Sequence, residues 1–120
     1  MSPRDRSASD GPRRARASGF PRKLRAWLAA AKADYEAGVD TTRPRNARQL
    51  AKWLTSQGEA ATDNAVRAWT RGDWLPEARF VGLLERLLVA PWCYLDDRRT
   101  PWPPSAEDRR AFRGAIRRGT

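Results

Sequence analysis

The chain is organised around ten residues, Asp63-Asn64-Ala65-Val66-Arg67-Ala68-Trp69-Thr70-Arg71-Gly72. Thr62 or Asp63 can accept a hydrogen bond from the free amides that begin a helix. Gly72 can end the same helix in a left-handed conformation, which costs glycine little. The sequence therefore predicts a short, capped helix over residues 63–71.

The two sides of this predicted helix differ in chemistry. At helical spacing, the side expected to face a core carries Ala65, Val66 and Trp69. Another side carries Asn64, Arg67 and Arg71. Arg can bond guanine through two hydrogen bonds, and Asn can do the same with adenine. The outer side therefore suits a reader of the major groove, and the alternative is an ordinary solvated face.

Apolar and turn residues around this helix form a longer pattern. Leu50-Ala51-Lys52-Trp53-Leu54 lies upstream, and Val-x-x-Trp-x-x-Gly at 66–72 is followed by Pro76, a Leu-rich segment and Tyr94-Leu95. This order resembles the phage-repressor/Cro-type, or lambda-repressor-like, helix-turn-helix family over about half the chain. The resemblance implies a compact all-α domain of four to five helices, whose third helix enters the major groove of double-stranded DNA.

The resemblance also implies which residues face DNA. By position in the motif, bases would be read by Asp63, Asn64, Arg67 and Ala68, and Thr62 would lie beside them. Family members commonly bind paired half-sites as dimers. We would look for a homodimer interface in residues 92–120, which contain Trp92, Trp102, Phe112 and Ile116.

A second group of basic residues begins the preceding helix, which Asn46 is expected to cap. Arg43, Arg45 and Arg48 cluster there. Basic groups at a helix N-terminus oppose the helix dipole, and a bound phosphate would relieve that cost. We therefore expect contacts with the DNA backbone from Arg43, Arg45, Arg48, Thr62 and Arg71.

Length and residue types indicate one all-α domain with tails. The chain of 120 residues has room for one modest core, to which six Trp contribute, and it has no convincing alternating strand pattern. We expect helices over 21–37, from the Asn46 cap to Gln57-Gly58, over 63–71 and over 76–89, a helical turn at 92–95, and a last helix after Ser105.

The net charge of +10 lies in the flanks of the chain. Residues 1–25 carry +6 and residues 98–120 carry +5, whereas residues 26–97 carry −1. We expect residues 1–19 to be a disordered arm, residues 20–97 the helix-turn-helix domain, and residues 98–120 a Pro-containing linker with a basic helix. Arg13, Arg14 and Arg16 could lie along phosphates or enter a minor groove, and the alternative is a solubilising tail with no defined partner.

Several classes of protein are disfavoured by what the sequence lacks. No apolar run is long enough for a membrane span, and no apolar segment follows the basic N-terminus as in a secretory signal. The chain has one cysteine, Cys93, which we expect to be buried, and no His, so neither a disulfide framework nor a zinc site is expected. We find no nucleophile with an activating base, so we expect no enzyme and no cofactor. A cytoplasmic location near the nucleoid of a bacterial or phage-infected cell fits.

Three functions remain open. The first is a sequence-specific transcriptional regulator of the repressor type. The second is a small phage or mobile-element protein that uses the same scaffold to bind a protein or nucleoprotein partner, through Trp74 and Trp102. The third is non-specific binding of nucleic acid by the Arg-rich arms alone.

Overall fold

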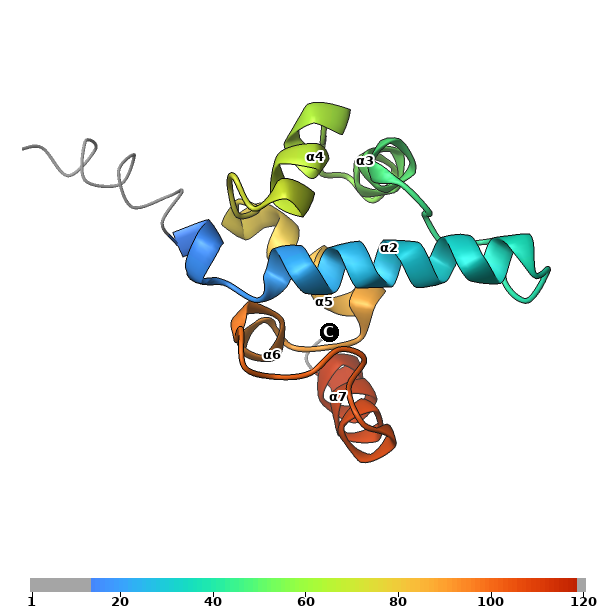
Figure 1. Ribbon diagram of the computed structural model, residues 1–120, viewed down its shortest axis with the longest axis vertical. Helices are drawn as coiled ribbons and strands as arrows, with labels where there is room; N and C mark the ends of the chain where they lie inside the picture. Colours follow the sequence, from blue (N-terminus) through green and yellow to red (C-terminus); the bar gives the residue numbers. More distant parts are fainter. Residues whose placement is uncertain (1–13, 119–120) are drawn as a thin grey trace, which may run out of the picture.

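All regular structure in the described residues, 14–118 of the computed structural model, is helical, and no strand occurs in that range (Figure 1). Residues 14–17 form one helical turn. The longer elements are α2 (Phe20–Glu36), α3 (Ala47–Ser56), α4 (Asp63–Arg71), α5 (Ala78–Leu88), α6 (Trp92–Asp96) and α7 (Ala106–Arg118). The prediction of an all-α fold is confirmed for these residues. No helix in the same range is both long and apolar enough to cross a membrane.

The ends of α3 and α4 are set by the residues that the sequence indicated. The Asn46 side chain accepts a hydrogen bond from the Gln49 amide at 2.9 Å, and the Thr62 side chain accepts one from the Ala65 amide at 3.1 Å. Gly72 ends α4 with φ of 79°, in the left-handed region. The expected helix over 63–71 is therefore confirmed at both ends.

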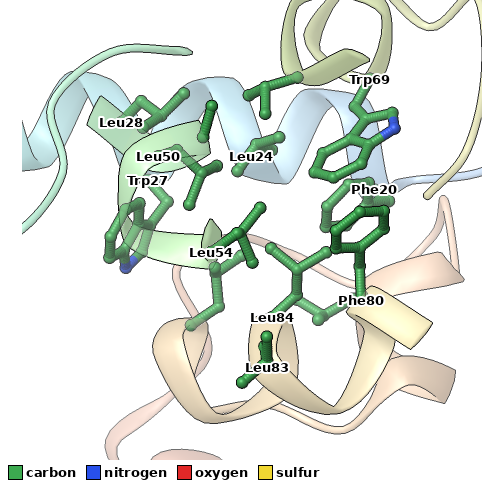
Figure 2. Packing of buried hydrophobic residues seen from close by; sticks show 14 of the residues in the cluster. Phe20, Leu24, Trp27, Leu28, Leu50, Leu54, Trp69, Phe80, Leu83 and Leu84 are labelled. Atoms are coloured by element: carbon green, nitrogen blue, oxygen red, sulfur yellow. The ribbon is translucent and has the colours of Figure 1, made fainter. Parts of the chain in front are cut away.

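The core lies where α2, α3, α4 and α5 meet. Phe20 and Leu24 of α2 are fully buried, and Figure 2 shows them pointing toward Trp69 of α4 and Phe80 of α5. The Trp69 and Phe80 rings lie 5.2 Å apart, with their planes inclined at 60°. Burying each such side chain contributes on the order of 1.5–3 kcal/mol, so these contacts hold α4 firmly on the domain.

Helix α2 separates two groups of helices. It contacts α4 on one side and α6 on the other, and α3 packs against α4. Figure 1 shows α3 and α4 above α2, with α6 and α7 below it. The α7 helix is attached through Phe112, whose ring lies 5.0 Å from that of Tyr94 in α6. The basic C-terminal helix is therefore on the side of α2 away from α3 and α4.

A buried lysine ties α2 to the end of α6. The Lys23 ammonium donates hydrogen bonds to the carbonyl oxygens of Tyr94 and Asp97, the latter at 2.6 Å, and to the Thr100 hydroxyl. Burial, together with the charge of neighbouring Arg22, lowers the pKa of Lys23 from 10.5 to about 8. Lys23 and the Thr100 hydroxyl, which lies 2.9 Å from the Tyr94 carbonyl oxygen and 3.0 Å from that of Asp97, thus share the carbonyls at the end of α6.

Two features differ from the sequence-based expectations. Packed structure begins by Arg14, before the expected domain boundary at residue 20, because Ala15 is buried and the Gly19 amide donates to the Asp96 carbonyl at 2.8 Å. The rest of the expected disordered arm, residues 1–13, lies outside the described residues. The expectation that Cys93 is buried is wrong: its position on the short α6 helix turns it outward, while Leu95 takes the core position.

Candidate nucleic-acid interface

The outer side of α4 presents two polar residues to solvent. Asn64 and Arg67 are exposed, three residues apart, while Val66 and Trp69 of the same helix are buried. Within residues 14–118, no side-chain hydrogen bond or ion pair engages Asn64 or Arg67. Both side chains therefore keep their donors and acceptors available for a ligand.

The other residues expected near bases are less exposed. Asp63 is partly buried in the first turn of α4, where a carboxylate is favoured by the helix dipole. Ala68 is also partly buried, and it lines a hollow of about 430 Å³ together with Trp69 and Trp74. Ala68 is thus turned toward the α4–α5 connection, and the exposed donors of α4 are those of Asn64 and Arg67.

Thr62 and Arg71 lie at the two ends of α4. Both are exposed. The Thr62 hydroxyl oxygen is used as the cap acceptor, which leaves its proton free to donate. The Arg71 Nε donates to Asp73 Oδ2 at 2.9 Å, but these side chains are 60% and 53% exposed. An ion pair so open to water is weak, so Arg71 is readily available to a phosphate.

The three arginines at the start of α3 have different surroundings. Arg43 is paired with Asp34 and Asp40, and its guanidinium lies 5.7 Å from the centre of the Trp27 ring. Hydrogen bonds from the Thr42 amide and hydroxyl, and the Arg43 charge, lower the pKa of Asp40. The charge of Arg43 is therefore offset locally.

Arg45 and Arg48 are better placed to meet a phosphate. The Arg45 guanidinium lies 3.6 Å from the centre of the exposed Tyr35 ring, which holds it at the surface. Arg48 is exposed on the first turn of α3. Together with Lys52, one turn further along α3, they give this end of the helix a positive charge.

Sequence reasoning missed two basic residues near this surface. Arg25 of α2 reaches the last turn of α4, where its Nη1 donates to the Thr70 carbonyl oxygen at 2.5 Å. No sequence signal shows this, because it depends on how α2 crosses α4. Lys52 lines an open hollow of about 500 Å³ with Arg45 and Trp53. Its four-residue spacing from Arg48 was a signal that could have found it.

Of the three arm residues expected to contact DNA, two lie within the described part of the chain. Arg14 is exposed and lines a hollow of about 360 Å³ with Trp74 and Trp92, and Arg16 is exposed. Arg13 lies outside the described residues. Of the rings expected at a dimer interface, Trp92 lies 5.0 Å from Phe20, so part of its surface is used within the chain.

The chemistry available here is that of hydrogen bonding and positive charge. Within the described part of the chain, no group of three or more His, Cys, Asp or Glu residues could hold a metal ion. The exposed groups on α3 and α4 are mainly guanidinium, ammonium, amide and hydroxyl donors. Such a surface can bind an anionic polymer and distinguish the hydrogen-bonding edges of bases.

Comparison of the chain with family models, curated proteins and solved structures found no significant match.

Proposed function

We propose that the protein is a sequence-specific DNA-binding transcriptional regulator of the repressor/Cro type, with α3 and α4 as its helix-turn-helix. The observation that carries the proposal is that α4 has one buried side and one exposed polar side. Buried Val66 and Trp69 fix the helix to the core, while Asn64 and Arg67 are exposed on another side without partners in the described residues. A short, rigidly held helix with such an outer face fits the major groove.

Each exposed residue then has a definite role. Asn64 and Arg67 bond base edges, with adenine and guanine as the preferred bases. Arg45, Arg48 and Arg71 neutralise phosphates, and Thr62 donates a hydrogen bond to the backbone. We leave Arg43 out of this set because Asp34 and Asp40 already offset its charge.

The position of α7 divides the positive charge between two sides of the protein. Because α7 lies across α2 from α4, its arginines do not contact the DNA segment that α4 reads (Figure 1). The salt-sensitive affinity at that segment therefore comes from α3, α4 and the N-terminal arm.

The test is a selection of bound duplexes from a random DNA pool by the full chain at near-physiological salt. The proposal predicts an enriched motif, and a palindrome would give the half-site spacing of a dimer. Absence of enrichment, together with binding that is lost when salt is raised, would favour non-specific binding by the arms instead.

A second candidate function is recognition of a protein partner by the surface around Trp74. This side chain is 48% exposed and lies between two hollows, one lined by Trp92 and Val81 and the other by Ala68 and Phe80. A large exposed aromatic residue flanked by hollows is a common anchor in protein interfaces. Here the scaffold would serve as an inhibitor or adaptor.

The two functions are separated by matched substitutions. If Trp74 binds a partner, Trp74→Ala abolishes capture of that partner from a cell extract, while Asn64→Ala with Arg67→Ala leaves it intact. If α4 reads DNA, the double variant loses the enriched motif and Trp74→Ala keeps it.

A further inference from the structure

A cavity of about 390 Å³ lies between α2, the end of α5, the segment 102–104 and α7. Its apolar walls include Trp27, Leu87 and Trp102, and its polar lining is formed by Arg43, Arg109 and Arg113. The volume is in the range of sites that hold small organic molecules. The DNA-reading surface proposed for α4 does not include this cavity.

The positive charge in this cavity is not balanced by its lining. Arg43 is offset by Asp34 and Asp40, but no ion pair within residues 14–118 engages Arg109 or Arg113. These two arginines are exposed and lie one turn apart on α7, a spacing at which like charges destabilise a helix. A bound anion would remove that repulsion, and the cavity has no acidic residue in its lining to compete with it.

We propose that this cavity binds a small aromatic carboxylate. Its ring would contact the indoles of Trp27 and Trp102, and its carboxylate would accept hydrogen bonds from Arg109 and Arg113. Charge-assisted hydrogen bonds from Arg are among the stronger polar contacts in proteins, and their planar donors match a carboxylate. The ligand would join α7 to α2, in addition to the aromatic contact that joins Phe112 of α7 to Tyr94 of α6.

The experiment uses 1-naphthoate as the probe and the full chain, with isothermal titration calorimetry as the readout. The uncharged 1-naphthalenemethanol tests whether the carboxylate contributes to the affinity. The double variant Arg109→Gln, Arg113→Gln tests whether these two arginines bind the carboxylate. Arg110→Gln is the matched control, because Arg110 is exposed on the same helix but does not line the cavity. Circular dichroism checks that each variant is folded. If the double variant is unfolded, the single variant Arg113→Gln is used in its place.

We expect 1-naphthoate to bind at one site and to lose about tenfold or more in affinity in the double variant. Arg110→Gln should stay within about twofold of the unmodified chain, because Arg110 does not line the cavity and its exposed charge is screened by salt. The alcohol should bind about tenfold more weakly than the carboxylate. The proposal is overturned if 1-naphthoate does not bind at millimolar concentration, if Arg110→Gln weakens it as much as the double variant does, or if the alcohol binds equally well.

Discussion

The Arg25 guanidinium donates a hydrogen bond to the Thr70 carbonyl oxygen, 2.5 Å away, and so joins α2 to the last turn of α4. The final carbonyls of a helix have no partner within it, and a cation at that end is favoured by the helix dipole. Val66 and Trp69 fix α4 from the buried side, and Arg25 fixes its C-terminal end. The orientation of Asn64 and Arg67 therefore depends on a contact made from a different helix.

Replacing Arg25 should disturb that orientation at a small cost in stability. Arg25→Ala is expected to lower the free energy of unfolding by about 0.5–1.5 kcal/mol, the net value of one hydrogen bond. Binding to the selected DNA site should weaken severalfold. Urea unfolding and fluorescence anisotropy measure the two effects. Arg86→Ala, which removes an exposed arginine from α5, should change neither quantity appreciably.

The two tryptophans that bracket Gly72 should respond very differently to truncation. Trp69 is 3% exposed and packs on Phe80, so Trp69→Ala should cost about 3–5 kcal/mol. Trp74 is 48% exposed, so Trp74→Ala should cost less than about 1 kcal/mol. Urea unfolding compares them directly, and similar losses in both variants would contradict the packing described here.

Two glycines give a second matched pair. Gly72→Ala places a side chain at φ of 79°, which should cost about 1–2 kcal/mol even though its nearest neighbour, a Pro21 side-chain atom, would be 3.7 Å away. Gly82 is exposed within α5, with nothing within 4 Å of an added Cβ. Gly82→Ala should therefore stabilise the protein by about 0.5–1 kcal/mol. Thermal unfolding should shift in opposite directions for the two variants.

Lys23 should stabilise the attachment of α6 to α2 through its hydrogen bonds. Lys23→Met keeps the aliphatic stem but leaves the carbonyls of Tyr94 and Asp97 without this donor. The expected loss is about 1–3 kcal/mol, because two part-buried acceptors lose a charged donor while the Thr100 hydroxyl stays beside them. Urea unfolding at pH 7 measures it.

The pH dependence of that loss has a definite sign. Because the pKa of Lys23 is lowered to about 8 from 10.5, the folded chain releases this proton at a lower pH than the unfolded chain does. Between these values the unfolded state binds more protons, so the contribution of Lys23 to stability rises with pH. The difference in stability between the unmodified chain and Lys23→Met should grow from pH 8 to pH 10.5. A difference that shrinks over this range would contradict the lowered pKa.

Local sequence signals were enough to place the central helix. A cap at Thr62, apolar residues at helical spacing and a glycine at position 72 determine the ends of α4 and its buried side, and the structure agrees with each. These features depend only on neighbours within one turn of helix. The exposure of Asn64 and Arg67 follows from the same periodicity.

Contacts between distant parts of the chain were not predictable in this way. The hydrogen bond from Arg25 to the Thr70 carbonyl depends on how α2 crosses α4, and the burial of Lys23 depends on the packing of the end of α6 against α2. From the sequence alone, a lysine four residues before Trp27 would be expected to be solvated, because its burial depends on how α6 packs against α2. Cys93 was misplaced for a related reason, because five helical residues are too few to reveal which side faces the core.

The central claim is that Arg67 reads a base, and the most direct test compares two affinities for each of three proteins. The affinity for the selected duplex is divided by that for a scrambled duplex, at one salt concentration, for the unmodified chain, Arg67→Ala and Arg86→Ala. We predict that Arg67→Ala loses about 1–3 kcal/mol of this discrimination while Arg86→Ala keeps it. Equal weakening on both duplexes would place Arg67 on phosphate and contradict the proposed reading of bases by α4.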